Sequence, residues 1–583
     1  MTKRQTTDWS ARDRLEARIS EAALLRAVPK QWADGVKALK TSDRAEPIWM
    51  RAGNWRERLE AFRVKHGDAL DWSMSDSEIC ERAKQIAAHT DDLLTLWPEP
   101  LSEVERLDVV RMVCKSVGVP EPVAITGVGA VARGVSHVWW RRMLRKKVAR
   151  VVEHGAIKLG VVNRHAGGYA SDNAVERRGE QLARNALMLS KAVMKNEAGQ
   201  FYTLADLAKT STANPAIRGG ELMTRIRGCE EFAEEAGHVG IFATLTTPSK
   251  FHAVTVGGKT AAALPRANPL YDGVSTPRDA QLWLRKMWAR ARAELARLGI
   301  VCYGFRVAEP HHDGTPHWHA LLWSNSEASL ATIEGVLKKH WLSDCADERG
   351  ADKFRTNFKK MIGGGAAGYM AKYIAKNIGH FDVGQHLDDA DGLQLKIWAG
   401  EVKGWQRVDA WASTWGIRQF QSIGQPSVTV WRELRRVTAD QVEAARMQGE
   451  KVAWKAWGAV HRVGDDMACW ARYMRAMGGA CLARLDYLIQ PAKRVNEVVN
   501  SYGETITQKR VVGVELQSGR WLISRRQAWT RVLDSVSVSQ SPAARAACGA
   551  PWTGFNNCTA RLTGRLRAAL LGRDDGRIAG ALP

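Results

Sequence analysis

Apolar residues recur at helical spacing through most of the first 235 residues. Segments such as RDRLEARISEAALLRAV and LSEVERLDVVRMVCKSV place them three and four positions apart, which is typical of amphipathic helices. We therefore predict a mostly helical N-terminal region over residues 1–150. The same spacing in NAVERRGEQLARNALMLSKAV and GGELMTRIRGCEEFAEEAG predicts a second helical region, a linker, over residues 151–235.

The pattern changes near residue 236. Runs rich in β-branched and aromatic residues predict three strands, at 238–247, 301–309 and 317–323. Helical spacing returns between and after them, at 277–300, at 327–345 and, behind a glycine stretch, within 363–379. This alternation of strands and helices predicts an α+β or α/β core over residues 236–380.

Beyond residue 380 the signals weaken. We predict an extension of the core over residues 381–440 and an accessory region over residues 441–583. Within the accessory region, VVGVELQSGRWLISRRQAW (511–529) predicts a short β segment. The tail RLTGRLRAALLGRDDGR is basic and amphipathic.

Basic residues strongly outnumber acidic ones. The 583 residues include 85 Lys and Arg against 62 Asp and Glu, which gives a formal net charge of +23 and a pI near 9.8. This excess favours a polyanionic partner, most often nucleic acid and sometimes a membrane surface, over a surface that is basic only for solubility. The basic segment WWRRMLRKKVAR (139–150) is either a phosphate-contacting surface or a solvated helix face.

Cysteine usage and hydropathy argue against several classes of protein. The nine cysteines are an odd number without a C-x-x-C pair, which argues against a disulfide framework or a cysteine-built zinc site. No run of about 18 apolar residues is present, and the first residues lack the apolar segment of a signal peptide. We therefore expect no membrane partner and a cytoplasmic location. The 24 Trp are expected mainly in the core, and a minority could stack on bases.

Four of the 15 histidines fall within nine residues, at 311, 312, 317 and 319. His317 and His319 lie two positions apart on a predicted strand, so their imidazoles point to the same face while Trp318 packs behind. Two imidazoles side by side are a ready pair of ligands for a divalent metal. If the strands around PHHDGTP (310–316) form a hairpin that pairs residue 309 with residue 317, Glu309 supplies a carboxylate. Such a set leaves coordination positions open and could polarise a phosphate oxygen.

Other interpretations of these histidines remain open. The pair could be solvated or hydrogen-bonded without a metal. A cupin-like site would require a Glu about four residues after the second His, where Trp323 and Ser324 stand, and a structural zinc site would require nearby Cys. His311, His312 and Asp313 are expected in the turn, where one of them could be an alternative ligand.

Two tyrosines mark the helix predicted within residues 363–379. Tyr369 and Tyr373 lie four positions apart, so they share a face with Lys372 and Lys376, and the apolar residues gather on the opposite side. The phenols could simply pack at the surface. They could also be nucleophiles, because nearby ammonium groups favour the phenolate, and the same lysines could bind a phosphate.

In combination, three stretches resemble the HUH endonucleases: FATLTTPSKF (242–251), EPHHDGTPHWHALLW (309–323) and GYMAKYIAKN (368–377). Within that superfamily the chain resembles the two-tyrosine rolling-circle initiators of the phage replication gene A protein family. Further stretches carry the same resemblance, which covers roughly residues 100–440: WWRRMLRKK (139–147), YASDNAVERRGEQLARN (169–185), NPAIRGGELMTRIRGCE (214–230) and RVDAWASTWGIRQFQSIGQPSVTVWRELRR (407–436).

This resemblance implies a fold and a set of functional residues. The fold would be α+β, with a central antiparallel-sheet HUH nuclease core that is ferredoxin- or RRM-like. His317 and His319 match the two metal histidines of the family, and Glu309 stands where related initiators place a carboxylate ligand. Tyr369 and Tyr373 match the paired nucleophiles. The metal would be Mg²⁺ or Mn²⁺.

The resemblance also implies a reaction and its partners. One tyrosine would attack a phosphate of single-stranded or melted origin DNA, form a 5′-phosphotyrosine and free a 3′-OH for a host polymerase. The second would attack the regenerated origin, and the released 3′-OH would close a circle. The linker of residues 151–235 would contact DNA. The P-loop pattern G-x-x-x-x-G-K-[ST] is absent, so we expect no nucleotide cofactor and a host helicase for strand separation.

Three alternatives to this reaction remain. The first is an HUH transposase or relaxase, within the same superfamily. The second is a metal-dependent phosphodiesterase that uses water, with structural tyrosines. The third is a basic DNA-binding protein without catalysis.

Overall fold

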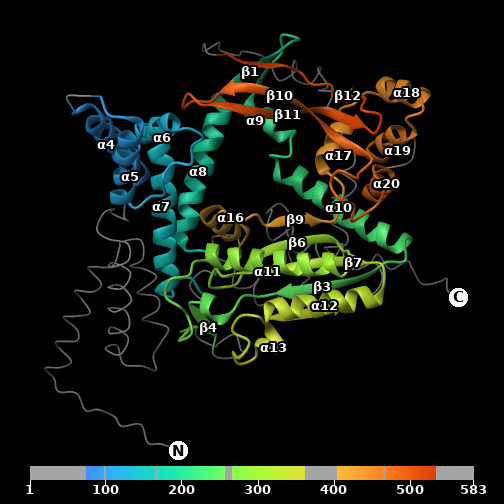
Figure 1. Cartoon of the computed structure of the whole chain (residues 1–583), viewed down its shortest axis with the longest axis horizontal. Helices are drawn as coiled ribbons and strands as arrows, with labels where there is room; N and C mark the ends of the chain where they lie inside the picture. Colours follow the sequence, from blue (N-terminus) through green and yellow to red (C-terminus); the bar gives the residue numbers. More distant parts are fainter. Residues whose placement is uncertain are drawn as a thin grey trace, which may run out of the picture.

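The computed structural model describes residues 74–97, 100–164, 168–256, 265–361, 404–463 and 467–532. Within these residues the chain is α+β, and every pair of neighbouring strands is antiparallel. Figure 1 shows the first described helices (blue to teal) at the left of a central sheet, and the C-terminal strands and helices (orange to red) above the sheet and to its right. The α+β prediction is thus confirmed.

The N-terminal helices begin at polar caps. Ser75, Ser102, Thr126, Ser136 and Ser171 each accept a hydrogen bond from a backbone N–H in the first turn that follows, which satisfies a donor that the helix leaves open. The helices are α4 (Asp76–Thr95), α5 (Glu103–Val117), α6 (Gly127–Gly134), α7 (His137–Lys158) and α8 (Asp172–Lys191). The helical character predicted for residues 1–150 is therefore confirmed from α4 onward.

The basic segment of α7 is bound into the protein. Arg145 forms an ion pair with Asp76 of α4, and the Lys147 ammonium donates to the carbonyl of Val117. Trp140 and Leu144 on the same helix are fully buried. This segment therefore holds helices together as well as carrying charge, because long basic side chains can bury their stems while their ends reach polar partners.

The linker of residues 151–235 is not helical throughout, contrary to the prediction. Two short strands, β1 (Val193–Asn196) and β2 (Phe201–Thr203), precede α9 (Leu204–Lys209) and α10 (Pro215–Glu235). β1 also pairs with β13 (Trp529–Arg531), which comes from the far end of the described chain. Such a distant partner leaves no trace in local spacing, which is why the pattern predicted only helix.

A five-stranded sheet forms the centre of the molecule, in the order β8-β3-β7-β6-β9. Its strands are β3 (Val239–Leu245), β6 (Tyr303–Pro310), β7 (Pro316–Ser324), β8 (Thr356–Lys360) and β9 (Phe420–Ile423). The three predicted strands are therefore confirmed as β3, β6 and β7. A small pair, β4 (Val254–Val256) and β5 (Pro265–Ala267), follows β3 and a short 3-10 turn, η1 (Ser249–Phe251).

Helices cover both faces of this sheet. Ala320 and Leu322 face a core formed with α11 (Pro277–Arg297) and α12 (Glu327–Trp341). Phe305 and Leu321 alternate to the other face and pack in a second core with α10, α17 (Val428–Leu434) and α20 (Trp470–Ala476). Because side chains alternate along a strand, a residue's parity decides which core it enters. Four further helices complete this part: α13 (Ala351–Phe354), α16 (Gly404–Trp415), α18 (Ala439–Met447) and α19 (Lys451–Val460).

The C-terminal part contains a long antiparallel ribbon. Its strands are β10 (Ile489–Val499), β11 (Thr505–Leu516) and the short β12 (Trp521–Ile523). The predicted β segment at 511–529 is confirmed in β11 and β12, but the pattern did not predict β10. Among the described helices, none combines the length and the apolar character that a membrane span requires.

Candidate metal centre

The β6–β7 hairpin brings the predicted metal ligands together. Its ladder pairs Glu309 with His317 and Val307 with His319, so the register assumed from the sequence is confirmed. The final ladder pair joins Pro310 and Pro316, which leaves a five-residue loop at its end. By parity, all three candidate ligands lie on the sheet face that also carries Phe305 and Leu321.

The donor atoms of this cluster are close enough to share one ion. The Nε2 atoms of His317 and His319 lie 2.9 Å apart. A carboxylate oxygen of Glu309 lies 3.8 Å from His319 Nε2, and the three donor atoms fall within 4.8 Å of one another. An ion about 2.1 Å from each of two imidazole nitrogens, at a right angle, holds them roughly 3 Å apart. The two nitrogens and the carboxylate oxygen therefore fit a divalent metal.

Burial and a neighbouring strand fix the orientation of the second histidine. Glu309 and His319 are 1% and 8% exposed. The Nδ1 atom of His319 lies 3.2 Å from the hydroxyl oxygen of Thr244 on β3, and the Phe242 ring stacks on the imidazole. With Nδ1 held by the hydroxyl, Nε2 points to the cluster. The sequence interpretation assigned no role to Thr244, because its contact with His319 depends on the pairing of β3 with β7.

Trp318 anchors the hairpin on the opposite face. Its side chain is fully buried, and the indole N–H donates to Gln281 of α11 at 2.9 Å. The guanidinium of Arg306 lies 3.6 Å from the centre of the ring. The packing of Trp318 behind the two histidines, expected from the sequence, is confirmed.

The loop beyond the hairpin carries a further set of polar groups. His311 and His312 lie in this loop, as expected, and the His311 ring centre lies 4.1 Å from that of His317. His252 Nδ1 lies 3.0 Å from a carboxylate oxygen of Asp313. Burial alone would raise the pKa of Asp313, but the charge and hydrogen bond of His252 lower the pKa below its usual value. His252 was not found from the sequence because it lies 61 residues before its partner.

A small hollow adjoins this loop. It has a volume of about 140 Å³. Its lining residues are Asn163, Arg164, His252, Val254, His311, His312 and Asp313. Because His311 packs on His317, this hollow lies next to the candidate metal ligands. Its lining includes Arg164 and three histidines, which can hold an anion, and the Asp313 carboxylate, which is paired with His252.

Helix α16 and the segment before α8 hold the loop in place. The Trp411 indole N–H donates to the carbonyl of Gly314 at 2.7 Å. The backbone N–H of Tyr169 donates to the carbonyl of His312 at 3.1 Å. These two bonds join the loop to residues on either side of it in the sequence. The position of the candidate metal ligands therefore depends on contacts that are distant along the chain.

The predicted nucleophile helix lies outside the described residues. Tyr369, Tyr373, Lys372 and Lys376 all fall between Met361 and Gly404, where the structure describes no residue. Their roles remain predictions from the sequence.

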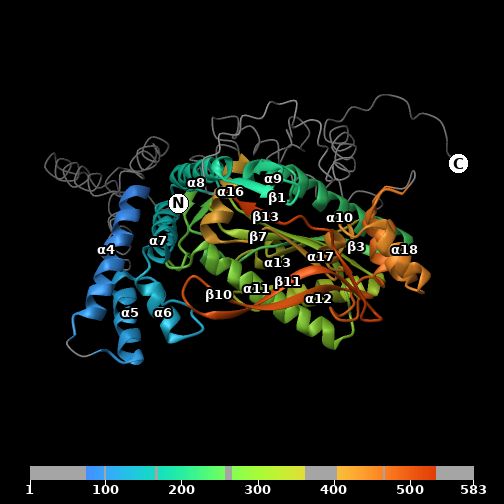
Figure 2. The same cartoon turned by 90° about the horizontal axis from the view of Figure 1, so that it is seen from above.

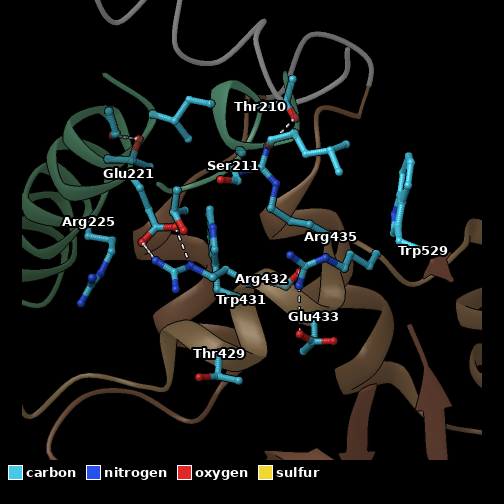
Figure 3. A pocket seen from close by; sticks show the side chains of 17 residues that line it. Thr210, Ser211, Glu221, Arg225, Thr429, Trp431, Arg432, Glu433, Arg435 and Trp529 are labelled. Carbon is cyan, nitrogen blue, oxygen red and sulfur yellow. Dashed lines mark hydrogen bonds and ion pairs between the residues drawn. The ribbon is translucent and has the colours of Figure 1, made fainter. Parts of the chain in front are cut away.

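A larger cavity, of about 430 Å³, is lined by residues of α10, α17 and β13 and shares none of them with the metal cluster. Figure 3 shows Arg432 turned toward Glu221, to which it donates two hydrogen bonds of 2.8 and 2.7 Å. Arg436 likewise donates to Glu433 at 2.9 Å. Because these arginines are paired with carboxylates, the cavity offers an anion less net charge than its arginines alone suggest.

Residues 121–381 match the family model of the bacteriophage replication gene A protein, a stretch that contains every metal-ligand candidate. The chain is 37% identical over 436 residues to the replication gene A protein of Escherichia phage 186, covering 74% of this chain and 59% of that protein. It is 35% identical over 440 residues to the replication gene A protein of Escherichia phage P2, covering 75% and 56%.

A prophage protein is also similar. The chain is 30% identical over 482 residues to a probable replication endonuclease from prophage-like region 1 of Salmonella typhi, covering 80% of this chain and 57% of that protein. The chain thus spans less than two thirds of the length of these three relatives. No solved structure matches it.

Proposed function

We propose that this chain, which belongs through residues 121–381 to the bacteriophage replication gene A protein family, nicks and rejoins one DNA strand to start rolling-circle replication. The observation that carries the proposal is the cluster of Glu309, His317 and His319, whose donor atoms lie within 4.8 Å of one another. The name of the prophage relative, a probable replication endonuclease, supports cleavage of DNA. The proposed enzyme is an HUH-type endonuclease and strand transferase.

The cluster would hold Mg²⁺ or Mn²⁺. A bound divalent ion would withdraw charge from the scissile phosphate. The hydroxyl of Thr244 would keep His319 Nε2 directed at the ion. Burial of Glu309 would keep its carboxylate next to the ion and away from bulk water. Two imidazole donors suit Mn²⁺ better than Mg²⁺, which prefers oxygen ligands.

Tyr369 and Tyr373 are the proposed nucleophiles. The phenolate oxygen of one tyrosine attacks phosphorus, the bond to the 3′ oxygen breaks, and that oxygen takes up a proton as a free 3′-OH. The product is a 5′-phosphotyrosine that keeps the energy of the cleaved bond. After one round the second tyrosine cleaves the regenerated origin, and the new 3′-OH attacks the first phosphotyrosine to close a circle. Lys372 and Lys376 would favour the phenolate or bind a phosphate.

The surroundings of the cluster are suited to a DNA strand. The hollow of about 140 Å³ beside it is lined by Arg164, His252 and His311, which can contact a phosphate next to the scissile one. The proposed partners are single-stranded or melted origin DNA, with a host helicase and polymerase. Phosphate contacts position a strand without reading its sequence, so origin choice would lie elsewhere on the protein.

The test is incubation with labelled single strands that tile the DNA encoding this protein, in the presence of Mn²⁺, followed by a denaturing gel. We expect a covalent protein–DNA band that disappears in the double variant Tyr369→Phe/Tyr373→Phe. Tyr202→Phe, on β2, is the matched control and should leave the band intact. A covalent band that survives the double variant would overturn the tyrosine mechanism.

Three other outcomes would replace the proposal. Cleavage without a covalent adduct would assign a metal-dependent phosphodiesterase that uses water. Binding without cleavage would assign a DNA-binding protein without catalysis. A covalent adduct on transposon-end or transfer-origin DNA, and not on the phage strands, would assign a transposase or relaxase.

A further inference from the structure

The ribbon β10–β11 is held at its base by the second core. Its ladder runs from Ile489↔Leu516 to Val499↔Thr505. Ile489, Val514 and Leu516 at the base are buried in the core that contains α17. The third strand, β12, pairs only with Gly513–Glu515, so most of the ribbon consists of two strands alone.

The tip of the ribbon is anchored at the opposite side of the molecule. The Glu504 carboxylate accepts hydrogen bonds from the backbone N–H of Ile125 at 2.7 Å and from the Arg133 guanidinium at 2.7 Å. Arg133 also lies over the Tyr502 ring, 4.2 Å from its centre. Figures 1 and 2 show the ribbon running from the C-terminal helices to α6, so it is fixed at both ends.

The middle of the ribbon is exposed on both of its faces. All residues of 493–497 and 507–510 are exposed, although successive residues of a strand point to opposite faces. Four of them are basic, Lys493, Arg494, Lys509 and Arg510, against one acidic residue, Glu497. Among the described residues, no ion pair neutralises these four bases.

Like charges face each other across this stretch. The ladder places Arg494 directly opposite Arg510. Like charges directly opposite on an antiparallel pair are destabilising. An anionic partner removes that cost, whereas the paired arginines of the cavity in Figure 3 have no such cost to remove.

The side chains on this face suit recognition of bases. The next ladder pair on the same face is Asn496↔Gln508, because two positions separate it from Arg494↔Arg510 along each strand. Arg can bind guanine through two hydrogen bonds, and Asn or Gln can bind adenine in the same way, at base edges in the major groove. That groove, about 12 Å wide, admits a two-stranded ribbon.

We propose that the face of the ribbon formed by Arg494, Asn496, Gln508 and Arg510 binds duplex DNA in the major groove, beside the strand that the metal centre cleaves. The location of this duplex, next to a nicked origin, rests on the proposed function. The binding of duplex DNA does not rest on the proposed function. It is inferred from the four exposed basic residues of the ribbon and from the polar side chains beside them.

The test compares variants in binding to labelled duplexes of about 30 base pairs that tile the nicked region, with a random duplex as reference. Arg494→Ala/Arg510→Ala should weaken binding to the preferred duplex at least about tenfold. Asn496→Ala/Gln508→Ala keeps the charge, so it should lower the preference over the random duplex while leaving random-duplex binding unchanged. Dimethyl sulfate methylates guanine N7 in the major groove. The wild-type protein and Asn496→Ala/Gln508→Ala should protect guanines of the bound duplex from it, whereas Arg494→Ala/Arg510→Ala should not.

The control is Arg111→Ala/Arg446→Ala, which removes two exposed arginines elsewhere. It should bind the preferred duplex like the wild type. Wild-type duplex affinity in the ribbon variants, or an equal loss for a single strand and a duplex, would overturn the inference. Circular dichroism and the thermal midpoint establish that each variant is folded.

The two proposals fail separately. If the wild type binds a duplex through the ribbon but never forms a covalent adduct, the nicking function is wrong and the ribbon inference stands. If the adduct forms on single strands and the ribbon variants bind duplexes normally, the ribbon inference alone is wrong.

Discussion

The two long hairpins of this protein, β6–β7 and β10–β11, share a topology and differ in what covers them. Every residue of β6 is buried, and the metal-ligand cluster lies where the hairpin is packed on both faces. The middle of β10–β11 is exposed on both faces. Metal ligands need fixed geometry and little competing water, whereas side chains that read a partner must reach it. Packing would thus separate the proposed chemical role of one hairpin from the proposed recognition role of the other.

Removal of the candidate metal ligands should have the largest effect. His317→Ala/His319→Ala should lower Mn²⁺-dependent cleavage at least about 1000-fold, because a metal supplies several kcal/mol to the transition state. Duplex binding should be unchanged. His89→Ala, at an exposed position of α4, is the control. Calorimetric titration with Mn²⁺ would report the lost site directly, and wild-type Mn²⁺ affinity in the double variant would refute the ligand assignment.

Truncation of an apolar side chain in each hairpin tests the difference in packing between the two hairpins. Trp318→Ala should lower the free energy of unfolding by about 3–5 kcal/mol, because it leaves a cavity in a closed core. Val495→Ala, at an exposed position of the ribbon, should change it by less than about 0.5 kcal/mol. Urea unfolding measures both. Equal losses would show that the ribbon is packed in solution.

Removal of the Thr244 hydroxyl that supports His319 should have a smaller effect. Thr244→Val keeps the shape of the side chain but removes the hydroxyl beside His319 Nδ1. Mn²⁺ affinity should fall about 10–100-fold. Thr332→Val on α12 is the control. A variant that binds Mn²⁺ like the wild type would show that the hydroxyl does not orient the imidazole.

The ribbon anchor predicts a pH dependence. The hydrogen bond from Arg133 lowers the pKa of Glu504 to about 2. A lowered pKa in the folded state gives stability that is complete above about pH 4.5 and is lost as the pH falls toward the folded-state pKa. The difference in unfolding free energy between the wild type and Glu504→Gln should therefore shrink between about pH 6 and about pH 3. A difference that is constant over this range would show that the carboxylate charge does not anchor the ribbon.

The smallest effect tests the opposed arginines. Arg494→Thr should leave stability unchanged or raise it by less than about 1 kcal/mol, since it removes like-charge repulsion in the ribbon. Thermal unfolding at low salt measures this. A clear loss of stability would mean that the arginine makes contacts that stabilise the fold.

The sequence predicted the β6–β7 hairpin better than the ribbon β10–β11. Runs rich in β-branched and aromatic residues, on either side of a turn bounded by Pro310 and Pro316, marked β6 and β7. Their register placed Glu309 beside His317. The ribbon strand β10 has few buried positions, so it lacks the apolar alternation that marks a strand. A pattern of burial can predict only those elements that are buried.

The supporting residues could not be predicted because they depend on the order of strands. Thr244 reaches His319 only because β3 lies next to β7 in the sheet. His252 reaches Asp313 from a segment that follows β3. Local spacing predicts strands and their faces, but it does not say which strands become neighbours.

The anchor of the ribbon has a consequence for the order in which the molecule is built. Ile125 and Glu504, which it joins, are separated by 379 positions. At a synthesis rate of roughly 5–20 residues per second, about 20–80 s would separate the synthesis of Ile125 from that of Glu504. The β6–β7 hairpin and α16, the helix that carries Trp411, precede the ribbon in the sequence and are therefore synthesised before it. During translation the segment that would cut DNA is thus finished before the segment that would hold the duplex.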